Sequence, residues 1–226
     1  LSSSSAASDV YKRQGFYSPS QLIQDARRHQ IEVRAVDVQS SYWESTLESA
    51  PTLSAADQPA IRLGLQNIKG LSQAGAERLI QSREAGSWTS LGALKQKAQL
   101  DQKDLDRLVD SGACLRLSGH RHQSHWQASG FAAPPPLFEP LGWAPGDEVT
   151  LNAPSEIEDI KADYNSLKFT LGRHPMNIIR PQNKALKRTL EATQLPSIRH
   201  GRFVEVAGLV TGRQRPSTAS GIIFMT

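Results

Sequence analysis

The residues with the clearest chemical potential begin with the tetrapeptide Lys69-Gly70-Leu71-Ser72, which precedes a stretch of helical character at 73–84. Glycine adopts backbone conformations that are closed to residues with a Cβ atom, so Gly70 favours a tight turn. Leu71 is suited to pack between the flanking elements, and Ser72 is a preferred helix N-cap. Amide N–H groups that point out of such a turn, at the positive end of a helix, can bind phosphate oxygens without reading a base.

Further basic residues follow in the same stretch, and they add positive charge beside the turn. A Gly-apolar-Ser turn followed by Ala76 and by Leu and Ile at helical spacing resembles the helix-hairpin-helix motif, although Ser stands where many members have a second Gly. The alternative is a pair of helices that only pack against each other. The DNA-binding interpretation predicts contacts from Lys69, Gly70, Leu71, Ser72, Arg78 and Arg83.

A second, weaker copy of the pattern follows about 30 residues later. The stretch "SLGALKQKAQLDQKDLDRLVDSGAC" reads as a helix capped by Ser90, a short Leu-Asp turn, and a helix capped by Asp101. Two such hairpins can grip both strands of a duplex across the minor groove. Residues 61–126 hold 10 Lys and Arg against 6 Asp and Glu, which agrees with a polyanionic partner.

The overall composition excludes several other classes of protein. The formal net charge is +4, and no apolar run approaches the length of a membrane span, so no membrane partner is expected. Cys114 is the only cysteine, so no internal disulfide can form, and a reducing, cytoplasmic compartment is the natural expectation. Cys114, His120, His122 and His125 match no standard zinc spacing, so the expectation is a core thiol and histidines along a helix that can add positive charge near DNA.

Other segments must position these residues. Ser18 and Pro19 predict the start of a helix, and the apolar residues within 31–38 predict one or two short strands. Ser155 begins a capping box, and the helix it starts is expected to bury one face made of Ile157, Ile160, Tyr164 and Leu167.

The C-terminal part of the chain changes to strand character. Residues 203–210 and 222–224 are rich in β-forming side chains, with a polar turn between them that carries Arg213 and Arg215. This pattern predicts the opening of a barrel or sandwich with a basic connecting loop. Residues 147–163 hold 6 acids and 1 Lys, so this segment is expected to face solvent or another protein rather than DNA.

Several segments together resemble one family. "GFYSPSQLIQDARRH", "AIRLGLQNIKGLS" and "IEDIKADYNSLKFTLGRHPM" are similar, in this order, to the end of the fingers, the helix-hairpin-helix region and the connector to the OB domain of bacterial C-family DNA polymerases, the α subunits of DNA polymerase III. "VTGRQRPSTASG" resembles the error-prone branch, which acts in translesion synthesis. The resemblance covers residues 15–226.

The resemblance and the elements together imply an α+β, mainly helical fragment of several domains, with a tandem helix-hairpin-helix followed by the first strands of an incomplete OB-fold barrel. The expected divisions are a non-native leader at 1–14, the end of the fingers at 15–58, the DNA-binding hairpins at 59–130, a linker and connector at 131–200, and the start of the OB fold at 201–226.

The implied function is the DNA-binding portion of an error-prone DNA-directed DNA polymerase. The family's catalytic carboxylates and Mg²⁺ belong to a palm domain that this piece does not match, so no catalytic or metal-binding residue is expected here. The implied partners are duplex DNA, a single-stranded template held by Arg213 and Arg215 of the OB region, and other polymerase or mutasome subunits. Two alternatives remain open, a non-catalytic accessory protein of repair or recombination and a hairpin array that packs only on protein.

Overall fold

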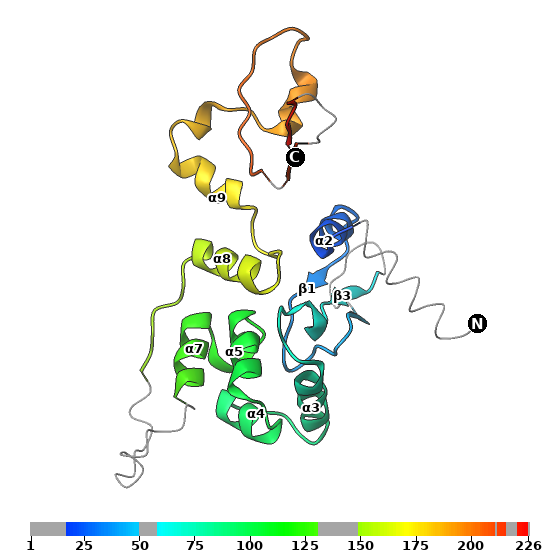
Figure 1. Ribbon diagram of the computed structural model, residues 1–226, viewed down its shortest axis with the longest axis vertical. Coiled ribbons are helices and arrows are strands. Elements are labelled where there is room, and N and C mark those ends of the chain that lie inside the picture. Colours follow the sequence, from blue (N-terminus) through cyan, green and yellow to red (C-terminus); the bar gives the residue numbers. More distant parts are fainter. Residues whose placement is uncertain (1–16, 50–57, 131–148, 211, 216–220, 226) are drawn as a thin grey trace, which may run out of the picture. The chain divides into compact units, whose positions relative to one another are not determined.

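A computed structural model describes residues 17–49, 58–130, 149–210, 212–215 and 221–225 of the chain. The chain forms two compact units, Leu1–Leu171 and Gly172–Thr226. Helices predominate, with small sheets beside them (Figure 1), so the expected mainly helical α+β class is confirmed for these residues. The predicted leader at 1–14 and the Pro-rich stretch at 131–148 lie outside the described residues.

The first unit begins with helix α2 (Pro19–Arg28), which starts where the sequence predicts. The Ser18 hydroxyl accepts a hydrogen bond from the Gln21 amide, and the Gln21 side chain accepts one from the Ser18 amide at 2.8 Å. This reciprocal pair satisfies two backbone donors that a helix start otherwise leaves without partners.

A three-stranded sheet follows, with strands β1 (Val33–Arg34), β2 (Thr46–Glu48) and β3 (Ala60–Arg62) in the order β1-β3-β2. Strand β1 runs parallel to β3, and β2 runs antiparallel to it. The strand character predicted over 31–38 is confirmed only for β1, because the chain then turns at Asp37, which binds the Ser41 hydroxyl through its own amide. Arg62 and Arg34 both donate to the Glu48 carboxylate, which lowers the pKa of Glu48 to about 2.

The hairpin region consists of the 3₁₀ turn η1 (Leu65–Asn67) and the helices α3 (Gln73–Glu84), α4 (Leu91–Lys97), α5 (Gln102–Asp110), α6 (Leu115–Ser118) and α7 (Arg121–Ser129). The predicted N-caps are confirmed: Ser72, Ser90 and Asp101 each accept a hydrogen bond from the amide three residues later. Helix α3 ends before Gly86, whose φ of +142° suits glycine.

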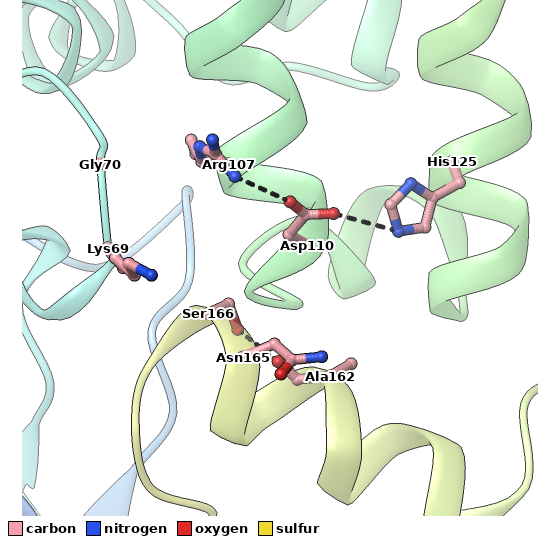
Figure 2. A pocket seen from close by; sticks show the side chains of 8 residues that line it. All are labelled: Lys69, Gly70, Arg107, Asp110, His125, Ala162, Asn165 and Ser166. Carbon is pink, nitrogen blue, oxygen red and sulfur yellow. Dashed lines mark hydrogen bonds and ion pairs between the residues drawn. The ribbon is translucent and has the colours of Figure 1, made fainter.

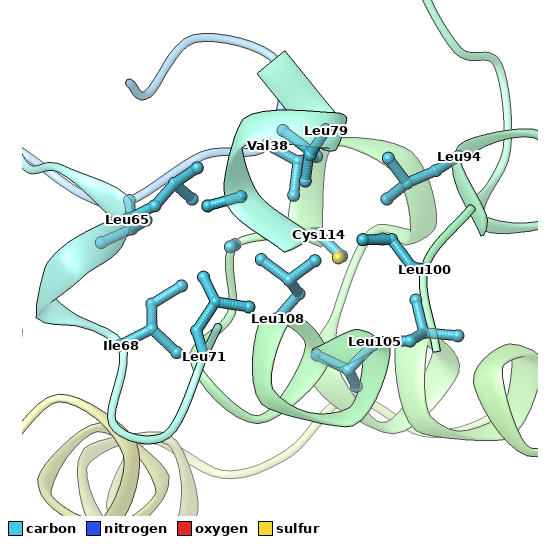
Figure 3. Close-up of a cluster of buried hydrophobic side chains, with 14 of the residues drawn as sticks. Val38, Leu65, Ile68, Leu71, Leu79, Leu94, Leu100, Leu105, Leu108 and Cys114 are labelled. Atoms are coloured by element: carbon cyan, nitrogen blue, oxygen red, sulfur yellow. The ribbon is translucent and has the colours of Figure 1, made fainter. Parts of the chain in front are cut away.

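One apolar core holds the sheet and these helices together. Figure 3 shows that side chains from η1 and the turn after it, among them Leu65, Ile68 and Leu71, meet Leu105 and Leu108 of α5. Leu65, Leu105 and Leu108 are completely buried. Full burial of one leucine contributes about 1.5–3 kcal/mol, so this cluster is the main reason the turn has a fixed position.

Helix α8 (Glu156–Ser166) begins at the predicted capping box, in which Ser155 and Glu158 bond reciprocally. It packs against α5 (Figure 1). Of the predicted apolar face, Ile160 and Leu167 are buried, whereas Ile157 is 47% exposed and Tyr164 is 36% exposed. The expected face is therefore only half correct, because α8 meets its neighbours along a narrow stripe.

The second unit contains α9 (Pro175–Gln182), the 3₁₀ turns η3 (Leu186–Arg188) and η4 (Ala192–Ser197), and the antiparallel strands β4 (Arg213–Gln214) and β5 (Phe224–Met225). The strand predicted at 203–210 is wrong for these residues, which form a single bridge between Val206 and Leu190. A strand needs a partner to satisfy its backbone and cover its side chains, and Phe203 and Val206 remain exposed here. The β4–β5 ribbon does not by itself establish a barrel.

Among the helices that the structure describes, none combines the length and the apolar character needed to cross a membrane.

Candidate nucleic-acid interface

The first hairpin turn (Lys69–Ser72) has the predicted backbone. Gly70 has a φ of +81°, a conformation that favours glycine. Leu71 is buried with 8% of its surface exposed, and Ser72 caps α3 by accepting from the Gly75 amide at 2.9 Å. The three residues thus have the structural roles expected from their types.

The amides of this turn do not point outward as predicted. The Lys69 amide donates to the Ser166 carbonyl at 2.8 Å, and the Leu71 amide donates to the Ile68 carbonyl at 3.3 Å. The Ser72 amide donates to the Asp104 carboxylate at 3.0 Å. These three donors already have acceptors inside the protein, so the prediction is wrong for them. Within the described part of the chain, the amides of Gly70, Gln73 and Ala74 have no acceptor.

Asp104 explains why the Ser72 amide turns inward. Its carboxylate is buried, with 2% of the residue exposed, and it also accepts from the Ser72 hydroxyl at 2.6 Å. Gly75 makes this approach possible, because a Cβ atom there would overlap the Asp104 carboxylate and lie 2.8 Å from the Ser72 Oγ atom. An internal carboxylate therefore takes the position beside the α3 N-terminus that an external anion would otherwise use.

The two hairpins repeat one geometry with an offset of 29 residues. The second hairpin turn (Ala98–Asp101) places Gln99 at a φ of +48°, buries Leu100, and caps α5 with Asp101. At the same offset Gly75 corresponds to Asp104, so the contact between α3 and α5 joins equivalent positions. The predicted second copy is therefore confirmed for the turn and the start of the helix after it, whereas the element before the turn is the 3₁₀ turn η1 in the first hairpin and helix α4 in the second.

A pocket of about 320 Å³ lies beside the first hairpin turn. We call it the turn pocket, and its lining residues come from the turn, α5, α7 and α8 (Figure 2): Lys69, Gly70, Arg107, Asp110, His125, Ala162, Asn165 and Ser166. Three of these carry positive charge or can acquire it, and one is a carboxylate. Of the residues predicted to bind DNA, the structure brings only Lys69 and Gly70 into this pocket.

Arg107 is the residue that sequence reasoning missed. The 29-residue offset makes it the counterpart of Arg78, so applying the repeat to the whole hairpin would have identified it. Arg107 lies close to the turn: a Cβ atom built on Gly70 would be 3.3 Å from its Nε atom. The histidines were expected only to add positive charge near DNA, and no pattern placed His125 or Asn165 in this pocket, because they reach it from separate helices.

The remaining predicted residues of the hairpins lie elsewhere. Arg83 donates to the carbonyls of Val38 and Ser41, at 3.2 and 2.9 Å, and its guanidinium stacks 4.8 Å from the centre of the Tyr42 ring. Through these contacts Arg83 joins α3 to the loop after β1. Arg78 is half-buried on α3 and does not line the turn pocket.

Arg213 and Arg215 belong to the second unit and are exposed. The sequence placed both in a polar turn, but Arg213 and Gln214 form strand β4, paired with Met225 and Phe224 of β5. The two arginines therefore lie on and directly after a strand of a ribbon.

Cys114 is buried, and desolvation raises the pKa of its thiol far above the usual range. A thiol that stays protonated is a poor nucleophile and a poor metal ligand, which agrees with the expected core role. His120 caps α7 through its ring nitrogen, and His122 bonds the Asn152 carbonyl. In the described ranges, no three His, Cys, Asp or Glu side chains are arranged to hold a metal ion.

Two aspartates of the acidic segment at 147–163 form ion pairs with an arginine of the same protein. Arg121 is buried and joins α7 to α8 through Asp159 and Asp163. Its Nη1 atom donates to the Asp159 carboxylate at 2.6 Å, and its Nη2 atom donates to the Asp163 carboxylate and to the Ser111 carbonyl. The sequence alone suggested that the acids of this segment face solvent or another protein. Asp159 and Asp163 instead bind Arg121 within the protein.

Comparison with known proteins agrees with this geometry. A family model described as a helix-hairpin-helix motif matches residues 30–124. The chain is 45% identical to the error-prone DNA polymerases of Pseudomonas paraeruginosa, Azoarcus sp. and Pseudomonas aeruginosa over 94% of its own length. It spans 20% of the length of these relatives. The resemblance to the error-prone branch of the C-family DNA polymerases is thereby confirmed, and the chain is a homologue of the part of these proteins with which it aligns.

Proposed function

We propose that this chain holds duplex DNA by its sugar–phosphate backbone, as part of an error-prone DNA-directed DNA polymerase that acts in translesion synthesis. The observation that carries the proposal is the convergence of Lys69, Arg107 and His125 on the turn of a helix-hairpin-helix element. The relatives are DNA polymerases, which favours this function over an accessory protein of repair or recombination. The bacterial cytoplasm is the matching compartment.

The charges in the turn pocket favour a phosphate over a base. Lys69 has an exposed side chain, and no residue of the described segments pairs with its ammonium group. Arg107 offers a planar fork of N–H donors that matches two oxygens of one phosphate. The Gly70 amide adds a neutral donor at the mouth of the turn. Contacts to phosphate oxygens carry no sequence information, so binding through these groups should be independent of sequence.

The second hairpin turn is a weaker phosphate site than the first. Ala98 stands where the first turn has Lys69, and Asp101 places a carboxylate at the N-terminus of α5. A carboxylate also lies beside the N-terminus of α3, where Asp104 accepts the Ser72 amide, so the difference between the two turns is the positive charge of Lys69. Lys97 and Lys103 are exposed nearby and supply the remaining positive charge. We infer that the first hairpin makes the closer contact with the duplex.

Replacing Lys69 with alanine is expected to weaken binding to a short mixed-sequence duplex by about fivefold and to reduce the slope of log Kobs against log salt by about one. The measurement is fluorescence anisotropy with the 226-residue chain between about 50 and about 200 mM salt. Lys161→Ala is the matched control, because Lys161 is an exposed lysine of α8 outside the turn pocket. Equal effects of the two changes, or a duplex affinity that does not depend on salt, would contradict the proposal.

The second unit is proposed to hold single-stranded template. Its support is the exposed β4–β5 ribbon with Arg213 and Arg215, since a basic strand pair beside exposed apolar side chains such as Phe224 suits backbone contact and base stacking. An OB fold that contains this ribbon is part of the same proposal, as is contact with other polymerase subunits.

Changing both Arg213 and Arg215 to alanine is expected to lower the affinity of the chain for a single-stranded oligonucleotide by about fivefold to tenfold, because two phosphate contacts are lost. Duplex affinity should change much less. Anisotropy titrations with the two probes, in the same buffer, give the comparison. A loss of the same size for both probes would count against a separate single-strand site.

Nucleotide addition itself is proposed for the whole polymerase rather than for these residues. Phosphoryl transfer in polymerases uses carboxylates that hold two metal ions. Among the residues that the structure describes, Glu48 and Asp163 bind arginines, and no three His, Cys, Asp or Glu side chains are arranged to hold a metal ion. Carboxylates paired with arginine do not fit a Mg²⁺ site, so we assign no catalytic step to the described residues.

A further inference from the structure

The turn pocket contains one residue whose charge opposes a phosphate. Figure 2 shows Asp110 between Arg107 and His125, with its two carboxylate oxygens directed to opposite sides. One oxygen lies 3.5 Å from the Arg107 Nη1 atom, and the other lies 3.5 Å from the His125 Nε2 atom. Arg107 and His125 are therefore both paired with a single internal carboxylate.

Helix stability does not explain an acid at this position. Asp110 is the last residue of α5, where the negative end of the helix dipole disfavours a carboxylate. Its pairs are long and partly exposed, with 38% of the Asp110 side chain and 44% of the Arg107 side chain accessible. Ion pairs of this kind contribute little to folding. The same features make both pairs easy to exchange for a stronger partner.

We propose that the turn pocket receives one phosphodiester group of duplex DNA, and that Asp110 limits the affinity of this site by holding Arg107 and His125 until the phosphate replaces it. The inference rests on the duplex binding proposed above and assigns it to a specific site and a specific opposing charge. Asp110 thus acts as an internal competitor for the phosphate.

The other pocket residues agree with a sequence in which the phosphate first contacts Lys69 and then replaces Asp110 at Arg107. The Lys69 ammonium has no partner among the described residues, so it can make the first contact with the backbone. Arg107 can then exchange one carboxylate oxygen for phosphate oxygens in a bidentate arrangement. From α8, Asn165 and Ser166 line the pocket without adding charge. Among the residues that line the turn pocket, Asp110 therefore supplies the only negative charge that the phosphate meets.

The test is the change Asp110→Asn in the 226-residue chain, with Asp106→Asn as the matched control. Asp106 is an exposed acid of the same helix that accepts a hydrogen bond from Gln102 and does not line the turn pocket. Each change removes one negative charge from α5. We expect Asp110→Asn to tighten binding to a mixed-sequence duplex about threefold to fivefold, and Asp106→Asn to change it by less than about 1.5-fold. Urea midpoints of both variants should match that of the unmodified chain.

A second comparison uses the Arg107→Ala background. If Asp110 acts by holding Arg107, the gain from Asp110→Asn should shrink to less than half when Arg107 is absent. Equal gains from the Asp110 and Asp106 changes, or an undiminished gain without Arg107, would overturn the inference while leaving duplex binding intact. If the unmodified chain fails to bind the duplex at all, the proposed function fails as well, and the two failures are thereby distinguished.

Discussion

Replacing Arg121 with alanine is expected to destabilise the first unit by about 3–5 kcal/mol, because the change removes one partner from a buried set of ion pairs. The Arg121 side chain is 8% exposed, and its guanidinium donates to two carboxylates and to the backbone carbonyls of Ser111 and Asp159. Without it, Asp159 and Asp163 face each other across a cavity, and Asp163 is itself only 18% exposed. Hydrogen exchange of the slowest amides in α5 and α7 measures the loss.

Arg116→Ala provides the control for this prediction. Arg116 also pairs with an aspartate, Asp37, at 3.1 Å, but its side chain is 63% exposed. Asp37 keeps the Gln39 amide and the Ser40 hydroxyl as donors after the change. We expect a cost below about 1 kcal/mol. If both arginines cost the same, burial would not be the reason that the Arg121 contacts matter.

Features that depend on a few neighbouring residues were predictable from the sequence. Ser18, Ser72 and Ser155 begin helices at the expected positions, because a capping hydroxyl and the amide it serves lie within three residues of each other. Gly70 and Leu71 behave as their types require, one in a left-handed conformation and the other buried. The start of each of these helices is therefore determined by residues that lie close together in the sequence.

Features that depend on distant residues were not predictable in this way. The Ser72 amide turns inward because of Asp104, which is 32 residues away. Arg83 was expected to face DNA, but carbonyls 42 and 45 residues before it bind its guanidinium. The segment at 203–210 has strand-forming residues, yet strand formation also requires a partner, and a single bridge is all that forms there. In each case tertiary contacts decide what the local pattern leaves open.

The candidate site was predictable only in part from the sequence. Lys69 and Gly70 were identified from the turn itself, and Arg107 was implicit in the 29-residue repeat. His125 and Asn165 enter the site because α7 and α8 pack against α5, which no spacing rule reveals. The opposing charge of Asp110 becomes visible only when its distances to Arg107 and His125 are known.

The change Gly75→Ala is expected to destabilise the hairpin unit by about 2–4 kcal/mol, although alanine is the better helix former by about 1 kcal/mol. The new methyl group overlaps the Asp104 carboxylate, so Asp104 must move. Movement breaks its two hydrogen bonds with Ser72, each worth about 1.5–3 kcal/mol when one partner is charged. Urea denaturation followed by far-ultraviolet circular dichroism measures the cost.

Gly130→Ala is the control, because Gly130 has an ordinary φ of −67° and the nearest atom to an added Cβ lies 3.4 Å away. This change should stay within about 0.5 kcal/mol of the unmodified chain. In an Asp104→Ala background, the cost of Gly75→Ala should fall well below its value in the unmodified chain, since the overlapping carboxylate is gone. Strictly additive costs would show that α3 and α5 do not meet through these two residues, and the geometric repeat that positions the turn pocket would lose its central contact.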